Sequence, residues 1–303
     1  MANPFLLLPD FLLILLGFGI CRYTGLGRPV WEAAEKLVYF LLFPVLLFGS
    51  ILKSPLQLGQ AASLATAGLG TTAIGIVVAL AIGRWPGVDR RLHASGAQTA
   101  YRFNSYIALA LSERLYGAPG LAWMALLIAL SVPLCNVAAV WPLARHGGHS
   151  YLHEIARNPL IISTVLGLIA NAAGLVLPEM LATVLQRIGV AALPLGLMAV
   201  GAGLTFGALK AAPHLATALL GIRHAVMPMV AMGLALAVHL APEQRGIVVL
   251  FGALPTSAAS YVLATRMGGD GSFVAGLVTV STMLGMLSVP LWLAALAALT
   301  GAG

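Results

Sequence analysis

The chain has 303 residues, of which 60% are hydrophobic and 8% are charged, and its mean hydropathy is +0.98. So little polar surface excludes a water-soluble globule and indicates an integral membrane protein. The formal net charge of +7 is not gathered into a basic run with interleaved aromatic residues, so nucleic-acid binding is not expected.

Ten apolar runs are long enough to cross a bilayer, which takes about 20 residues each. Prolines, glycines and charged residues separate them. The predicted spans are residues 5–21, 33–52, 60–83, 92–112, 120–144, 159–177, 181–206, 213–240, 246–265 and 272–299. A polar joint at residues 147–158 divides the chain into a first unit, 1–146, and a second unit, 159–303. The predicted fold class is therefore all-α, with ten transmembrane helices.

The basic residues are divided unequally between the two sides that ten spans define. Cytoplasmic loops collect Lys and Arg, so we assign the richer side and the joint to the cytoplasm, and both termini to the outside. The inner side holds Arg22, Arg28, Lys36, Arg84, Arg90, Arg91, Arg145, Arg157, Lys210 and Arg266. The outer side holds Lys53, Arg114, Arg187 and Arg245.

The second half of the chain repeats features of the first. Residues 42–47 (LFPVLL) are matched 150 residues later by residues 192–197 (ALPLGL). Residues 130–134 (LSVPL) return identically 157 residues later as residues 287–291. Because a unit of five spans is odd, the second copy enters the membrane inverted, which is the arrangement of many secondary carriers.

The fourth predicted span is the most polar one, and Arg102 lies near its centre. A charge at that depth costs at least ~2.5–3.5 kcal/mol, so we expect Arg102 to face a partner or a wet cavity, where it would bind an anion. The alternative is a structurally paired or snorkelling arginine.

The ninth predicted span contains Pro255, which removes a backbone donor and favours a break in the helix. Asn104 with Ser105 in the fourth span, and Thr256 with Ser257 in the ninth, are residue types that cap a helix that starts anew. Two such breaks at mid-membrane would aim two partly positive helix N-termini at one spot and favour an anion. The alternative is a continuous helix that Pro255 merely kinks.

Three further polar residues lie in predicted spans. Asn136 in the fifth span either lines the same cavity or holds two helices together. Arg223 and His224 in the eighth span are candidates for coupling or for an internal ion pair. Because no Asp or Glu is expected deep in any span, the acidic site of a sodium/proton antiporter is not predicted.

No metal or cofactor is expected. Cys21 and Cys135 lie on or near different apolar segments and do not form a disulfide framework. His146, His149 and His153 in the joint are a weak metal-binding pattern because no cysteine accompanies them.

Several of these motifs together resemble the auxin efflux carrier family, which includes bacterial proteins described as malate or malonate permeases and the plant PIN carriers. They are residues 37–52 around Pro44, Arg102-Phe103-Asn104, residues 157–162 (RNPLII), residues 193–197 with Gly201, and Pro255-Thr256-Ser257. The resemblance implies the fold of the bile-acid/sodium symporters, with spans 1, 2, 6 and 7 as a scaffold and spans 3–5 and 8–10 as a moving transport domain. It also implies that spans 4 and 9 cross at their breaks.

The plant carriers have proline followed by asparagine at both crossings, and this chain departs from that pattern twice. Phe103 stands where the first proline would be, and Thr256 stands where the second asparagine would be. Auxin is therefore not the expected substrate.

We expect a secondary transporter of the inner membrane, not an enzyme, that moves a small organic anion, a carboxylate by preference, by alternating access of the elevator type. The expected partners are that anion and the lipid bilayer, with a homodimer through the scaffold helices as an option and no nucleic acid. The alternative is a membrane receptor that binds a small ligand without transporting it. The residues expected to bind the substrate are Arg102, Asn104, Ser105, Asn136, Pro255, Thr256 and Ser257, with Arg223 and His224 as coupling candidates.

Overall fold

The computed structural model describes residues 8–53, 58–143, 159–204, 209 and 212–300, and every regular element among them is a helix. The first half contains α1 (Leu8–Tyr23), α2 (Arg28–Leu37), the π-helical turn η2 (Val38–Leu42), α3 (Phe43–Lys53), α4 (Leu58–Ala81), the 3₁₀ turn η3 (Ile82–Arg84), α5 (Arg90–Gly96), the 3₁₀ turn η4 (Ala97–Ala100) and α6 (Ser105–Leu143). The predicted joint, with His146, His149 and His153, lies outside the described residues.

The second half has the same all-helical character. It contains α8 (Pro159–Ala172), α9 (Glu179–Val190), α10 (Ala192–Ala202), α11 (Pro213–Gly221), the π-helical turn η7 (Ile222–Val226), α12 (Met227–Ala237), α13 (Pro242–Ala253), α14 (Ala259–Arg266) and α15 (Gly271–Thr300). The all-α part of the predicted fold class is thus confirmed.

Within the described ranges, six helical stretches are long and apolar enough to cross a membrane, so the chain is a multi-pass membrane protein. They are Arg28–Lys53, Ala61–Arg84, Arg90–Ala139, Glu179–Ala202, Pro213–Ala237 and Gly271–Thr300. Each of the ten predicted ranges overlaps at least one helix.

The boundary between the fourth and fifth predicted spans is a kink and not a loop. Helix α6 runs through it, and only Gly117 leaves the helical conformation, with φ 63° and ψ −155°. Glycine adopts such a positive φ without steric cost. The chain therefore turns at Gly117, between the predicted spans 92–112 and 120–144.

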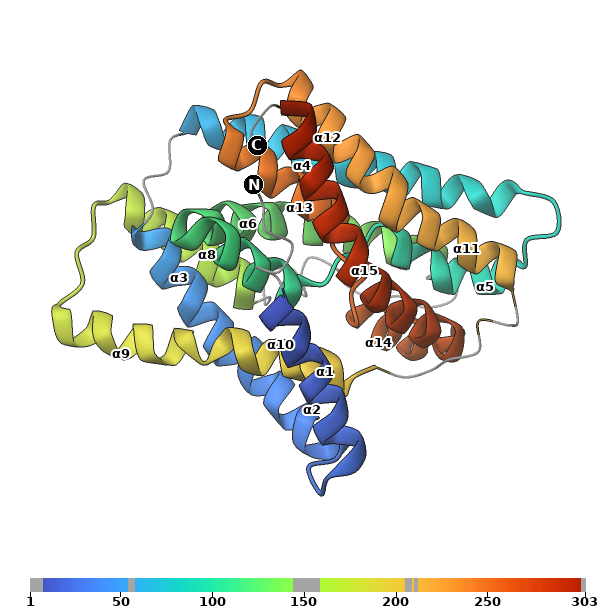
Figure 1. Ribbon diagram of the computed structural model, residues 1–303, viewed down its shortest axis with the longest axis horizontal. Coiled ribbons are helices and arrows are strands. Elements are labelled where there is room, and N and C mark those ends of the chain that lie inside the picture. Colours follow the sequence, from blue (N-terminus) through green and yellow to red (C-terminus); the bar gives the residue numbers. More distant parts are fainter. Residues whose placement is uncertain (1–7, 54–57, 144–158, 205–208, 210–211, 301–303) are drawn as a thin grey trace.

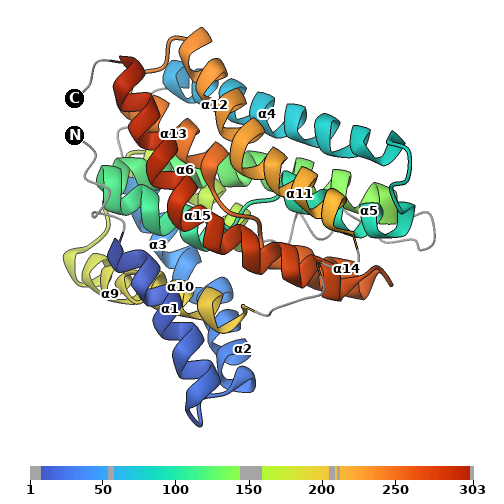
Figure 2. The same ribbon diagram turned by 45° about the vertical axis from the view of Figure 1, so that its right-hand side comes forward.

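The helices pack in two groups that α6 joins (Figure 1). Helices α1–α3 pack with α8–α10, and α4 and α5 pack with α11–α15. Helix α6 contacts α3, α8 and α10 of the first group and α4 and α13 of the second. The same division is visible after a 45° turn in Figure 2, where α1, α2, α9 and α10 lie below α4, α11 and α12.

Helices α1 and α10 cross closely because glycines stand at the contact. A Cβ atom at Gly17 would clash with the backbone of Met198, and one at Gly201 would clash with the carbonyl of Ile14. A second link ties α1 to α6. Arg114 donates from Nε to Asp10 Oδ2 at 3.1 Å and from Nη2 to Asp10 Oδ1 at 3.4 Å.

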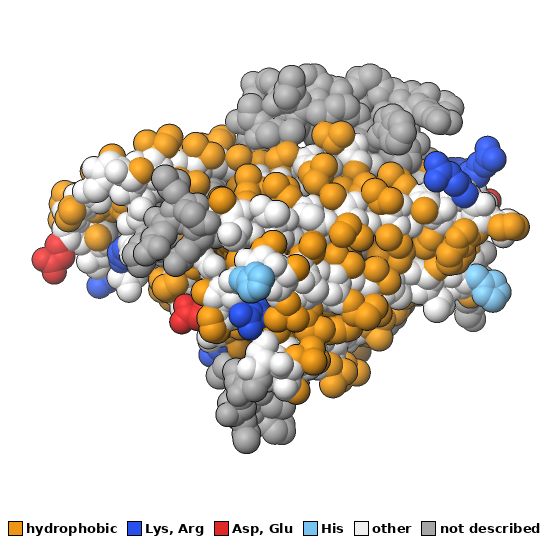
Figure 3. Space-filling model, turned by 90° about the horizontal axis from the view of Figure 1, so that it is seen from above, with side chains coloured by type: hydrophobic (Ala, Val, Ile, Leu, Met, Phe, Trp, Pro, Cys, Tyr) orange, Lys and Arg blue, Asp and Glu red, His pale blue; other side chains and the backbone are white. Residues whose placement is uncertain are grey.

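Large hydrophobic side chains cover much of the surface, as expected of a protein in contact with lipid acyl chains. Phe40 is 65% exposed, Val77 67% and Leu287 69%. Figure 3 shows hydrophobic side chains over most of one face of the molecule.

Candidate functional site

The first helix interruption lies between η4 and α6, at residues 101–104. Asn104 is buried, and its Oδ1 accepts hydrogen bonds from the N–H groups of Tyr106 at 3.0 Å and Ile107 at 3.2 Å. Asn104 therefore caps α6, which is the role its residue type predicted. Ser105 is half-buried as the first residue of α6.

The second interruption lies between α13 and α14, at residues 254–258. Pro255 and Thr256 are buried there. Ser257 Oγ accepts a hydrogen bond from Ala259 N–H at 3.2 Å, at the start of α14. The helix is broken over five residues, so the alternative of a continuous helix with a proline kink is wrong.

The two interruptions touch each other. The backbone N–H of Asn104 donates to the carbonyl of Pro255 at 2.9 Å. Beside this bond the rings of Phe103 and Phe251 meet edge to face, with their centroids 4.6 Å apart. The structure thus brings together the two interrupted segments that contain Arg102, Asn104, Ser105, Pro255, Thr256 and Ser257.

Arg102 lies directly before this crossing and is half-buried. Its Nη1 donates to Gln98 Oε1 at 3.4 Å, and Gln98 Nε2 donates in turn to the carbonyl of Ser95 at 3.1 Å. A buried glutamine therefore steadies the guanidinium without neutralising its charge.

Arg223 is the largest fully buried side chain of the described residues, at 1% exposure. Its Nη2 donates to the carbonyls of Phe251, at 3.4 Å, and Gly252. Its Nε and Nη1 are buried and have no partner among the described residues. The ion pairs found in the described ranges are Arg28 with Glu32 and Glu35, and Arg114 with Asp10. The internal ion pair suggested for Arg223 is therefore replaced by bonds to backbone carbonyls.

His224 links the second interruption to α15. Its Nε2 lies 2.8 Å from Ser281 Oγ and its Nδ1 lies 2.9 Å from Ser288 Oγ. Ser281 Oγ also accepts the backbone N–H of Thr256 at 2.9 Å. The Thr256 hydroxyl is fully buried and has no partner among the described residues.

The carbonyl of His224 has lost its ordinary helix partner, because residue 228 is a proline and has no N–H. The indole N–H of Trp292 donates to this carbonyl instead, at 2.8 Å. Next to this site, η7 is a π-helical turn in which Met227 N–H bonds the carbonyl of Ile222. Such turns occur frequently at functional sites.

Asn136 is half-buried on α6, directly after the buried Cys135. The Cys135 thiol lies 3.8 Å from the carbonyl of Tyr101, in the first interruption. Asn136 therefore follows directly on a residue of α6 that contacts the first interruption.

Sequence reasoning missed Ser281, Ser288 and Gln98. Ser288 belongs to the repeated LSVPL motif, and its counterpart Ser131 accepts a hydrogen bond from Thr72 at 3.3 Å. A search for polar residues inside the repeats could therefore have found Ser288. Ser281 and Gln98 carry no such signal, because serine and glutamine are ordinary residues at helix contacts.

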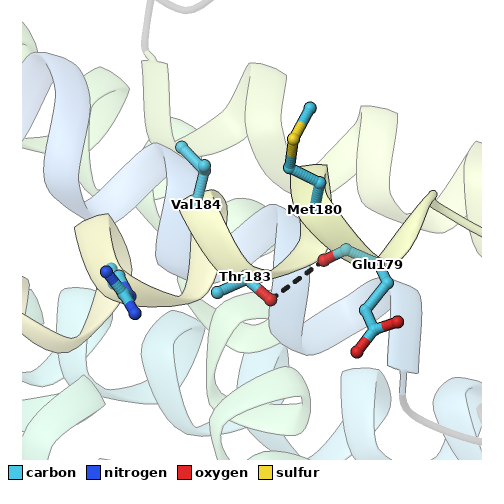
Figure 4. A pocket seen from close by; sticks show the side chains of 5 residues that line it. Glu179, Met180, Thr183 and Val184 are labelled. Carbon is cyan, nitrogen blue, oxygen red and sulfur yellow. Dashed lines mark hydrogen bonds between the residues drawn. The ribbon is translucent and has the colours of Figure 1, made fainter.

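Two surface depressions lie elsewhere, on α9 (Figure 4). One is lined by Glu179, Met180, Thr183, Val184 and Arg187, and Thr183 Oγ1 donates to the carbonyl of Glu179 at 2.9 Å. All five residues come from one helix, so they form an open surface that cannot enclose a ligand. The described residues contain no metal-binding group of His, Cys, Asp and Glu, and Cys21 and Cys135 are both free thiols.

Comparison with known proteins adds two findings. A model of the family described as membrane transport protein matches residues 89–293. The chain is also 24% identical over 298 residues to a protein of Methanothermobacter thermautotrophicus described as an uncharacterized transporter. That alignment covers 96% of this chain and 98% of its relative.

Proposed function

Because this chain belongs to the membrane transport protein family, the family of the auxin efflux carriers, we propose that it is a secondary transporter of a small organic anion. The family is one of transporters and not of enzymes. Alternating access of the elevator type would carry the anion, a carboxylate by preference, across the cytoplasmic membrane.

One observation carries this proposal: two interrupted helices meet through the Asn104–Pro255 bond, with Arg102 and Arg223 beside them. In secondary carriers the half-helix N-termini point at anionic substrate groups. Here the half-buried guanidinium of Arg102 and the fully buried guanidinium of Arg223 add their positive charge. No carboxylate among the described residues pairs with Arg223, so its positive charge is not cancelled by an ion pair within the described ranges.

Within this proposal Arg102 attracts the anion, and Asn104, Thr256 and Ser257 bond it or hold the ends of the half-helices. Ser105, Asn136 and Pro255 complete the lining. The buried hydroxyl of Thr256 has no partner in the described part of the chain, which supports this assignment, because a buried polar group normally has a partner.

We further propose ten spans in two inverted units, 1–146 and 159–303, joined by residues 147–158. The paired bonds Thr72–Ser131 and His224–Ser288 support the duplication, since the same repeated serine is used in each unit. The packing of α1–α3 with α8–α10 supports a scaffold of spans 1, 2, 6 and 7, and the remaining helices would form the transport domain. The scaffold would also offer the surface for a homodimer.

The proposed topology, with both termini outside the inner membrane, agrees with the contacts between helix ends. Arg114 bonds Asp10, and Asn171 Nδ2 bonds the carbonyl of Leu52, and all four residues are assigned near the outer side. Asp270 N–H bonds Ser95 Oγ, and both of these are assigned toward the inner side. Among these contacts, no bond joins ends that the topology places on opposite sides.

We also place the chain with the bacterial members that resemble malate and malonate permeases. Phe103 and Thr256 replace the proline and asparagine of the plant pattern, which argues against auxin as the substrate.

The test is flux into liposomes that contain the purified protein. We would offer radiolabelled malonate, malate, benzoate and indole-3-acetate, with protein-free liposomes as the control. Saturable uptake of a carboxylate supports the proposal. Thermal stabilisation by a carboxylate without any flux supports the receptor alternative, and the absence of both contradicts an organic-anion site.

A further inference from the structure

The helix interruption after α13 removes the helix partners of two carbonyls at the carboxyl end of α13. In a continuous helix the carbonyl of Phe251 would accept the N–H of residue 255, which is a proline. The carbonyl of Gly252 would accept the N–H of Thr256, which instead donates to Ser281 Oγ. Both carbonyls lie among residues that are fully buried, where unpaired polar groups are costly.

Arg223 supplies the hydrogen bonds that these two carbonyls lack. Its Nη2 donates to both carbonyls, and its side chain comes from a different helix, within η7. The carboxyl end of a helix also carries about half a negative charge, and a cation placed there is stabilising. The guanidinium is therefore held by oxygen atoms and by the helix dipole, without a carboxylate partner among the described residues.

Carriers with broken helices use such half-helix ends and unwound carbonyls to bind a free coupling cation. We propose that Arg223 is a tethered cation that occupies this cation site in the present chain. Removal of its side chain would then open a site for a free cation of suitable size. The inference rests on the proposed transport function for its meaning, but the site itself is tested without transport.

The experiment measures the thermal unfolding midpoint of the purified full-length protein in detergent. The probes are methylguanidinium chloride and NaCl, with choline chloride at the same ionic strength as reference. Arg223→Ala removes the tethered cation. Arg223→Gln also removes the charge but keeps an amide donor for one carbonyl, so it preserves the fold if the alanine variant does not fold.

Arg245→Ala is the matched control. Arg245 also donates to a backbone carbonyl, that of Leu240 at 2.9 Å, and also has a buried Nε without a partner among the described residues. It lies at the opposite end of α13, where no pair of carbonyls is freed by a break.

We expect methylguanidinium to raise the midpoint of the Arg223→Ala protein by about 2–5 °C for each tenfold increase in concentration above its dissociation constant. Na⁺ should stabilise Arg223→Ala or Arg223→Gln more than choline does. The wild-type protein and Arg245→Ala should not distinguish Na⁺ from choline.

Specific stabilisation of the wild-type protein by Na⁺ would overturn the proposal, because the site should already be full. The proposal would also be overturned if methylguanidinium and Na⁺ raised the unfolding midpoint of the Arg223 variants no more than that of Arg245→Ala. Both results leave the organic-anion flux untouched, so failure here is distinguishable from failure of the proposed function.

Discussion

Asn104 donates its backbone N–H to the carbonyl oxygen of Pro255 at 2.9 Å, so the two helix interruptions are joined main chain to main chain. Such a bond does not depend on the side chains at either position, provided that residue 104 is not a proline. Phe103 and Thr256 can therefore depart from the plant pattern while the crossing keeps its geometry. Their side chains can then differ without breaking this bond.

The charge of Arg102 provides the first prediction. Arg102→Gln keeps most of the side-chain length and deletes the charge, and loss of one charge-assisted hydrogen bond is worth ~1.5–3 kcal/mol. Affinity for the transported anion should fall roughly 10- to 150-fold, and Thr256→Val should cause a smaller loss in the same direction. Isothermal titration measures both, with Arg187→Gln on the exposed face of α9 as the control. Wild-type affinity in a folded Arg102→Gln protein would disprove the anion site.

Two substitutions of Asn104 can separate its capping role from its proposed role in binding the substrate. Asn104→Asp keeps the oxygen that accepts from Tyr106 and Ile107, so stability should stay near that of the wild type. The new negative charge should nevertheless weaken anion binding. Asn104→Ala loses the cap and should cost about 0.5–2 kcal/mol of stability. Thermal unfolding and ligand titration of the two variants distinguish these effects; equal affinity of the Asp variant and the wild type would contradict the binding role.

His224 is a candidate for coupling protons to transport, because an imidazole ring can take up and release a proton. Its ring faces Ser281 and Ser288, and the neighbouring Arg223 is the charged group beside it. Transport by His224→Ala should lose its dependence on pH. His214→Ala, at an exposed position, should retain it. If the pH profile of the His224 variant matches that of the wild type, His224 has no part in coupling.

Gly201 provides a test of the helix packing. Gly201→Ala places a Cβ against the carbonyl of Ile14 and should destabilise the protein by about 1–3 kcal/mol, the usual cost of overpacking. The matched control is Gly233→Ala on α12, where a Cβ would have no neighbour within 4 Å. Its effect should stay within about 0.5 kcal/mol. Comparable midpoints for the two variants would mean that α1 and α10 are not in contact as described.

The topology is tested by labelling single cysteines in intact cells, after Cys21 and Cys135 have been replaced. An impermeant maleimide should react with Glu179→Cys, at an exposed position between the sixth and seventh predicted spans, because that loop is assigned to the outside. His149→Cys in the joint should react only after the cells are opened. Labelling of His149→Cys in intact cells would reverse the assignment.

The sequence predicted those parts of the site that depend on residue type. Pro255 has no N–H, and Asn104 has a short side chain with an acceptor oxygen, so both breaks were identifiable from the chemistry of single residues. The partners of Arg223 could not be identified in this way, because they are the main-chain carbonyls of Phe251 and Gly252. Every residue type has such a carbonyl, so the side chains at positions 251 and 252 give no signal.

The position of the kink in α6 could not be predicted from residue type either. Gly117, Pro119 and Gly120 are all able to interrupt a helix, and the sequence does not decide between them. The structure uses Gly117, at φ 63°, and Pro119 then falls in the first turn of the helix that follows, where its missing N–H is harmless.

Pro228 and Trp292 are linked by the single carbonyl of His224, and this link has an evolutionary consequence. If residue 228 regained an N–H, that carbonyl would have its helix partner and would no longer depend on the indole N–H of Trp292. Relatives without a proline at position 228 should therefore accept an apolar ring without a donor, such as phenylalanine, at position 292. These two positions should covary across the family although they lie on different helices, and substitutions at one should be tolerated mainly in chains that have already changed at the other.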